Sequence, residues 1–140
     1  MREKILGLLG LMRRANAISV GEDHTADTLR SGKGKLLLLA SDISDNARRK
    51  AENLSNGRNV ATVPLPFTRD ELGKALGLSS CSVAAVTDLG FADAFAGLLA
   101  EQWPESYEQL AAQVHARREK AARRKTQKGS KREGTRRTNV

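Results

Sequence analysis

Cysteine and aromatic residues are scarce in this chain of 140 residues. The one cysteine, Cys81, excludes an internal disulfide and a zinc site built from several cysteines. Aromatic residues make up 4% of the sequence, so the core must be built mainly from leucine, valine, isoleucine and alanine. The length suffices for one domain with a substantial core, and the sparing use of cysteine is typical of a cytoplasmic protein.

Acidic residues are scarce at the C-terminal end. Residues 115–140 hold 11 of the 24 lysines and arginines, but only two of the 16 acidic residues. That segment therefore carries a net charge of +9, whereas residues 1–114 carry a net charge of −1. Basic segments of this kind usually contact nucleic acid or another polyanion. A tail that only keeps a small domain in solution is the alternative.

Signals for export or membrane insertion are also missing from the sequence. The apolar stretch at residues 5–12 runs directly into Arg13 and Arg14, without a convincing small-residue cleavage site. It is too short to cross a bilayer. Its apolar residues recur at helical spacing instead, which predicts a first helix that packs on the core.

Four consecutive leucines, Leu36 to Leu39, are the most informative feature that is present. A strand of leucines has no polar side, so it must be covered on both faces, as in a sheet between two layers of helices. The glycines and lysines at residues 31–35 predict the end of a helix and a tight turn before this strand. The small polar residues at 40–44 follow it, where such sheets present their functional edge.

Helix and strand patterns alternate along residues 1–101 with short connections. This order predicts an α/β fold, a three-layer α/β/α sandwich with a central mixed sheet of about four strands. We expect helices over about residues 2–15, 24–31, 45–54, 69–76 and 88–101, and strands over about residues 17–20, 36–40, 60–63 and 82–86. The expected helix caps are Asp23, then Ser44 or Asp45, then a capping box of Thr68 and Glu71, then Asp88.

After this domain, the sequence predicts a basic helical extension over residues 102–125 and a disordered basic tail over residues 126–140. Tyr107, Leu110 and Val114 give the extension a weak amphipathic pattern. The tail has one apolar residue, Val140, and so cannot bury enough surface to fold alone. The cations expected to make nonspecific phosphate contacts are Arg117, Arg118, Lys120, Arg123, Arg124 and Lys125.

No motif in the sequence organises catalysis or metal binding. The segment Gly32-Lys33-Gly34-Lys35 has one residue between its glycines and precedes a strand, so it is not a Walker-type phosphate loop. The spacing of histidine, cysteine and aspartate suggests no metal site, and no local pattern organises a catalytic triad. Cys81 is interpreted as a packed or semi-exposed thiol. We therefore expect no enzymatic activity and no cofactor.

Several short motifs follow one another along the chain: Leu6-Gly7-Leu8-Leu9, Gly21-Glu22, Leu29-Arg30-Ser31-Gly32-Lys33-Gly34-Lys35-Leu36, Leu39-Ala40-Ser41-Asp42, Asp70-Glu71-Leu72-Gly73-Lys74-Ala75-Leu76-Gly77 and Val83-Ala84-Ala85-Val86-Thr87-Asp88-Leu89-Gly90-Phe91-Ala92. In this order they resemble the ribosomal protein L seven Ae / L thirty e family, in its bacterial YlxQ-type branch. The resemblance covers about residues 2–99. It implies a compact α/β/α sandwich that binds structured RNA, typically the bent helices called kink-turns.

The resemblance also implies a site at the start of the second helix, where the family pattern is Gly-x-Asn-Glu-x-x-Lys. This sequence has Gly21-Glu22-Asp23-His24-Thr25-Ala26-Asp27 there. The glycine matches, but aspartate, histidine and aspartate stand at the Asn, Glu and Lys positions. The last change replaces a cation with an anion. The family layout also implies that Ser44, Arg48 and the loop Ser79–Cys81 border the same RNA face.

The candidate RNA-binding residues are Gly21, Glu22, Asp23, His24, Asp27, Arg30, Lys33, Lys35, Ser44, Arg48, Ser80 and Cys81. Free N–H groups at a helix start attract anions, whereas carboxylates repel phosphate but can accept hydrogen bonds from base amino groups. A structural role is the alternative for each group. The acids can cap the helix, His24 and Arg48 can be ordinary surface residues, and residues 79–82 can be an ordinary turn.

Two functions remain open. The first is a non-catalytic RNA-binding protein, associated with the ribosome or with transcription and translation, that recognises structured RNA of the kink-turn kind and uses its tail for phosphate contacts. The second is a protein-interaction module of the same machinery, with the tail as a nonspecific nucleic-acid tether. The expected partners are structured RNA or the ribosome, with no membrane and no small-molecule substrate, and we expect a monomer.

Overall fold

A four-stranded mixed sheet forms the centre of the molecule. The computed structural model describes the backbone of residues 1–138 and the side chains of residues 1–124. The strands are β1 (Ile18–Val20), β2 (Leu36–Leu39), β3 (Ala61–Pro64) and β4 (Val83–Val86), in the order β1-β4-β2-β3. Strand β2 pairs in parallel with β3 and antiparallel with β4, and β4 pairs antiparallel with β1. The predicted mixed sheet is therefore confirmed.

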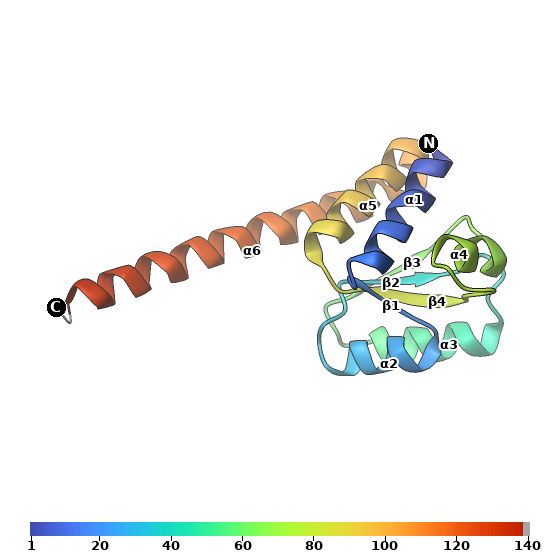
Figure 1. Cartoon of the computed structure of the whole chain (residues 1–140), viewed down its shortest axis with the longest axis horizontal. Helices are drawn as coiled ribbons and strands as arrows, with labels where there is room; N and C mark the ends of the chain where they lie inside the picture. Colours follow the sequence, from blue (N-terminus) through green and yellow to red (C-terminus); the bar gives the residue numbers. More distant parts are fainter. Residues whose placement is uncertain (139–140) are drawn as a thin grey trace.

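Helices cover both faces of this sheet, as Figure 1 shows. One layer contains α1 (Arg2–Arg14), α4 (Arg69–Ala75) and α5 (Leu89–Gln102), and the other contains α2 (Glu22–Arg30) and α3 (Asp45–Ser55). A last helix, α6 (Pro104–Thr138), turns back along α5 and extends beyond the domain. The predicted three-layer α/β/α sandwich is thus confirmed.

The leucine side chains of β2 pack against both helical layers. All four side chains are buried. Because successive side chains of a strand point to opposite faces, Leu36 and Leu38 join the cluster under α1 and α5, while Leu37 and Leu39 join the cluster under α2 and α3. The leucine run therefore holds the two helical layers on one strand.

The second helix begins earlier than the sequence predicted. Gly21 is the N-cap of α2, with a φ of 87°, and the Thr25 N–H donates the first helical bond to its carbonyl. This backbone conformation is easily adopted by glycine alone. It lets the chain pass directly from β1 into α2, so Asp23, the expected cap, lies inside the first turn instead.

The other predicted caps are present. The Ser44 hydroxyl accepts from the Ala47 N–H, and the Asp88 carboxylate accepts from the Phe91 N–H. Thr68 and Glu71 form the complete capping box at the start of α4. These short-range bonds satisfy N–H groups that a helix leaves without an internal partner.

The first turns of α6 pack on the domain. Val114 is buried, and the buried Tyr107 donates a 2.6 Å hydrogen bond from its hydroxyl to the Pro64 carbonyl. Trp103 makes edge-on contacts with both Phe67 and Tyr107. The predicted apolar pattern of the extension therefore faces the main hydrophobic cluster.

The backbone of α6 continues as a helix past residue 126, where the sequence led us to expect disorder. Seven of the 13 residues at 126–138 are lysine, arginine, glutamate or glutamine, which are good helix formers, but the stretch also contains two glycines and three threonines and has no apolar face. Residues 139 and 140 lie outside the described residues. The predicted boundaries at residues 101 and 125, between the domain, the helical extension and the tail, remain a prediction.

Within the described part of the chain, no helix combines the length and apolar character that crossing a membrane requires.

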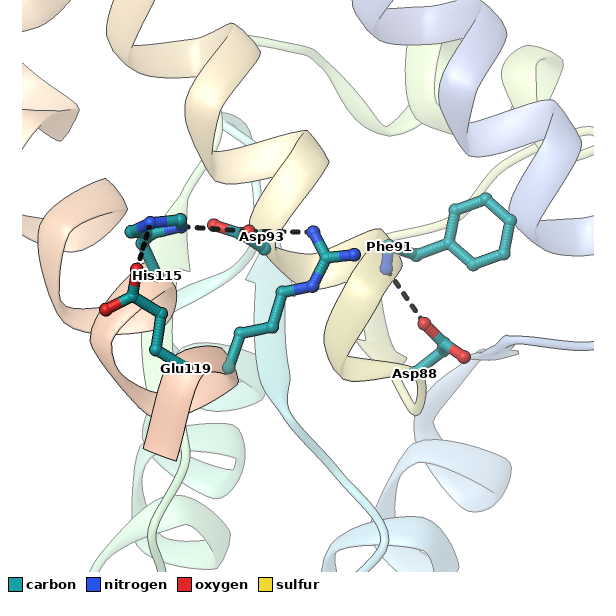
Figure 2. A network of polar contacts seen from close by, with 6 residues as sticks. Asp88, Phe91, Asp93, His115 and Glu119 are labelled. Atoms are coloured by element: carbon teal, nitrogen blue, oxygen red, sulfur yellow. Dashed lines mark hydrogen bonds and ion pairs between the residues drawn. The ribbon is translucent and has the colours of Figure 1, made fainter. Parts of the chain in front are cut away.

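Polar contacts fix α6 against α5 (Figure 2). The Asp93 carboxylate on α5 lies 3.2 Å from Nδ1 of His115 and accepts a 3.0 Å hydrogen bond from Arg118. On its other side, Nε2 of His115 lies 3.2 Å from Glu119. Although burial acts to raise the pKa of Asp93, the hydrogen bonds from Arg118 and His115 hold it below its ordinary value.

We expect these contacts to make stability depend on pH. The hydrogen bond to Asp93, its charge and that of Glu119 raise the pKa of His115 above its ordinary value of 6.5. A raised folded-state pKa adds stability that is fully present below the unfolded pKa and is lost as pH rises through the folded pKa. The Tm advantage of the wild-type chain over His115→Gln should therefore be full below about pH 6.5 and should shrink as the pH rises above it. Thermal denaturation followed by circular dichroism at low salt measures it, and a difference that does not vary with pH would contradict this account.

Candidate nucleic-acid interface

Three chain segments meet at one end of the sheet. The Gly21 N–H, at the exit of β1, donates to the Val83 carbonyl over 3.1 Å, and the Ala40 N–H, at the exit of β2, donates to the Ser82 carbonyl over 2.9 Å. These bonds bring together the start of α2, the start of α3 and the loop before β4. We call this surface the α2 face, and it consists of residues 21–27, Ser44, Arg48 and Ser80.

The start of α2 is open to solvent. Glu22, Asp23, His24 and Asp27 are all exposed, and none of the described side chains caps the N-terminal N–H groups of this helix. Asp27 has a cation nearby, since its carboxylate lies 3.8 Å from Arg30 one turn later. The carboxylates of the first turn complement the helix dipole and are also available as hydrogen-bond acceptors.

Polar contacts with β1 fix the position of α2. Thr25 is the one polar residue among the buried residues of the described chain, and its hydroxyl lies 3.5 Å from the Ser19 carbonyl, at the limit of a hydrogen bond. The hydroxyls of Ser19 and Thr28 lie 2.5 Å apart. These contacts join α2 to β1, so the exposed side chains of α2 are held on a rigid support.

The start of α3 has mainly structural roles. The Asp42 carboxylate accepts a 2.7 Å hydrogen bond from the Arg69 N–H, and this bond is the largest cause that lowers the pKa of Asp42. The Ser44 hydroxyl is used as the α3 cap. Arg48, one turn into α3, is exposed, as are the neighbouring cations Arg49 and Lys50.

The loop before β4 contains one correction to the predicted site. The thiol of Cys81 is buried, with 4% of the residue exposed, and its Sγ donates to the Val83 carbonyl. Burial also raises the pKa of this thiol. Cys81 therefore belongs to the main hydrophobic cluster, and its buried side chain is not available to RNA. Ser80 is the exposed residue of this edge.

The predicted basic residues of the α2–β2 turn lie at the opposite end of the sheet. The Lys35 N–H donates to the carbonyl of Val86, where β4 ends and β2 begins. Arg30 and Lys33 flank the same turn and are exposed. The structure therefore divides the predicted RNA-binding residues between two ends of the molecule.

A cavity of about 730 Å³ opens beside this turn. We call it the basic groove, and its six cations are Arg30, Lys35, Arg58, Arg117, Lys120 and Arg124. Sequence reasoning missed Arg58, a single cation in the turn between α3 and β3. The only sequence signal at Arg58 is the preceding turn Asn56-Gly57. This turn does not indicate that Arg58 lies near α2 and α6 in the fold.

The predicted cations of α6 do not act as one set. Arg117, Lys120 and Arg124 lie along one side of the helix and line the basic groove. Arg118 is held by Asp93 on α5, and Arg123 is exposed but does not line the groove. The side chain of Lys125 lies outside the described residues.

Comparison with known proteins identifies the family of this chain. Residues 3–96 match the model of the Ribosomal protein L7Ae/L30e/S12e/Gadd45 family. The chain belongs to this family. The match ends within α5, so α6 and its groove cations lie outside the region that the family model covers.

The relatives match about two thirds of the chain. RNA-binding protein YlxQ of Bacillus subtilis (strain 168) is 37% identical over 92 residues, which is 66% of this chain and 91% of that protein. Large ribosomal subunit protein eL30 of Dictyostelium discoideum is 32% identical and covers 71% of this chain and 90% of that protein. A solved structure of a protein with unknown function from Bacillus halodurans C is 29% identical, with a TM-score of 0.64, and covers 69% of this chain and 96% of that chain.

Within this family fold, Gly73 positions the Ser80 edge of the α2 face. A Cβ atom at Gly73 would lie 2.7 Å from both the Cα and the N atom of Ser80, closer than such atoms can approach. We therefore expect Gly73→Ala to displace the loop and to lower the free energy of unfolding by about 1–3 kcal/mol. The midpoint of urea denaturation measures this loss.

The matched control is Gly7→Ala on α1, where an added Cβ meets nothing within 4 Å. Alanine there should raise the free energy of unfolding by about 0.5–1 kcal/mol, because it restricts the unfolded chain more than glycine does. Equal midpoints for the two variants would show that the close approach of Gly73 to Ser80 does not constrain the loop.

Proposed function

We propose that this chain is a non-catalytic, cytoplasmic RNA-binding protein of the translation machinery, and that its α2 face contacts structured RNA. The observation that carries the proposal is the open start of α2, supported from below and bordered by the exposed Arg48 and Ser80. Family membership supports it, since relatives are named as an RNA-binding protein and as a protein of the large ribosomal subunit.

The chemistry of the α2 face suits base edges more than phosphates. Backbone N–H groups at a helix start can bind an anion, but Glu22 and Asp23 add negative charge there. Carboxylates accept hydrogen bonds from the amino groups of bases. We therefore infer that the acids of α2 face unpaired or sheared bases, while Arg48 contacts the phosphate backbone nearby.

Kink-turn recognition is the finer part of the proposal, and Asp27 is the residue on which it depends. The family pattern has lysine at this position, whereas the exposed carboxylate of Asp27 repels phosphate. A protein with Asp27 must bind its RNA without a cation at residue 27 itself, although Arg30 lies 3.8 Å from this carboxylate. The cations of α6 supply phosphate contacts elsewhere and partly offset the loss.

A protein-docking function is the second candidate, and the exposed acids Glu22, Asp23 and Asp27 favour it. A basic protein surface would complement them, and α6 would then act as a nucleic-acid tether. The two functions differ in what a change of charge at residue 27 does to RNA binding.

We expect Asp27→Lys to strengthen the binding of a kink-turn RNA. The change removes a repulsive charge and adds a charge-assisted hydrogen bond, which is worth about 1.5 kcal/mol or roughly tenfold in Kd. Fluorescence anisotropy with the full chain, one kink-turn RNA and one plain hairpin at near-physiological salt measures the effect.

The control is Glu108→Lys, which makes the same change of charge at an exposed residue of α6. A gain confined to Asp27→Lys and to the kink-turn would support the α2 face as the RNA-binding surface. An equal gain in both variants, or for both RNAs, would show only nonspecific attraction. Wild-type binding to neither RNA would favour the protein-docking function.

A further inference from the structure

The basic groove is a strongly positive surface at the end of the sheet away from the α2 face. Its six cations come from three parts of the fold: the end of α2 with the turn before β2, the turn after α3, and α6. Among the residues whose side chains are described, no carboxylate lines it. Among the described side chains, Arg30 alone of the six forms an ion pair with a carboxylate, that of Asp27.

Two of these cations are held in place by backbone carbonyls. Nε of Arg58 donates to the Leu29 carbonyl over 2.9 Å, and its Nη1 donates to the Leu54 carbonyl over the same distance. Nη1 of Arg117 donates to the Asn59 carbonyl over 3.3 Å. A guanidinium has five N–H donors, so each keeps donors for a ligand. These bonds position the charge without neutralising it.

The groove depends on the docking of α6. Arg117, Lys120 and Arg124 recur at helical spacing and form one wall. Asp93 holds Arg118 on the side of α6 that faces α5. The same contacts that fix α6 on α5 in Figure 2 therefore direct the neighbouring cations into the groove. This wall lies beyond residue 96, the last residue of the family match.

We propose that the basic groove binds the sugar–phosphate backbone of a second RNA segment, so that the chain holds two segments at opposite ends of its sheet. The inference rests on the proposed RNA-binding function, but not on which RNA the α2 face recognises. The ends are separated by β2, about 13 Å of strand. Guanidinium groups match phosphate oxygens in geometry, and a continuous run of cations without acids complements a continuous run of phosphates.

The test is the binding of a labelled single-stranded dodecauridine to the full-length chain. The groove variant is Arg117→Gln, Lys120→Gln and Arg124→Gln together, with Lys35→Glu as a second variant from the other wall. The control variant is Lys4→Gln, Arg14→Gln and Lys74→Gln together, which removes three exposed cations from α1 and α4. Circular dichroism verifies that each variant folds.

The groove variant should weaken dodecauridine binding at least about tenfold at near-physiological salt, and Lys35→Glu should also weaken it. Loss of three phosphate contacts should flatten the slope of log Kd against log salt by about 2. The control variant should stay within about twofold of wild type. A wild-type chain saturated with a structured RNA should still bind the dodecauridine.

Three outcomes would overturn the inference. Equal losses in the groove and control variants would show diffuse attraction to the whole basic chain. Competition between the two RNAs for one site would contradict a second segment. Stronger displacement by a glutamate peptide than by unlabelled RNA would identify the groove as a docking site for an acidic protein. In each case, binding of the structured RNA to the groove variant is measured as well. If this binding is retained, the proposed function of the α2 face still holds.

Discussion

The burial of β2 between two layers of helices is the constraint on which the rest of the structure depends. Leu36 and Leu38 fill one layer, and Leu37 and Leu39 fill the other. Full burial of a leucine is worth about 1.5–3 kcal/mol, so this one strand provides much of the attachment of both layers. Because β2 is central and pairs with β3 and β4, its two ends define the two ends of the domain.

Those two ends differ in charge. At the exit of β2 the α2 face presents carboxylates, an open helix start and the exposed cation Arg48. At the entry of β2 the turn before Lys35 meets α6, and cations gather without acids along the groove. The first end lies within the region that the family model covers, whereas one wall of the second end lies beyond it. The basic groove is thus formed partly by the region that the family model covers and partly by α6, which lies beyond that region.

The sequence predicts the features that depend on neighbouring residues. The leucine run, the capping box of Thr68 and Glu71 and the Ser44 cap are local signals, and the structure contains all of them. Features that depend on distant contacts were missed or misplaced. Gly21 is the N-cap of α2, and its N–H donates to the distant Val83 carbonyl. The Cys81 N–H donates to the Arg69 carbonyl, and the Cys81 side chain is buried in the main hydrophobic cluster. The groove joins Arg58 to Arg117, which lie 59 positions apart in the sequence, and no periodicity in either segment indicates that meeting.

The central claim is that one buried sheet separates two RNA-binding ends. Ultraviolet cross-linking of the full-length chain to a structured RNA with a single-stranded extension, followed by mass spectrometry of the cross-linked peptides, tests it most directly. The account predicts cross-links in peptides from both the α2 face and the basic groove, with few on the exposed surfaces of α1 and α4. Cross-links confined to one end, or spread evenly over the surface including α1 and α4, would contradict it.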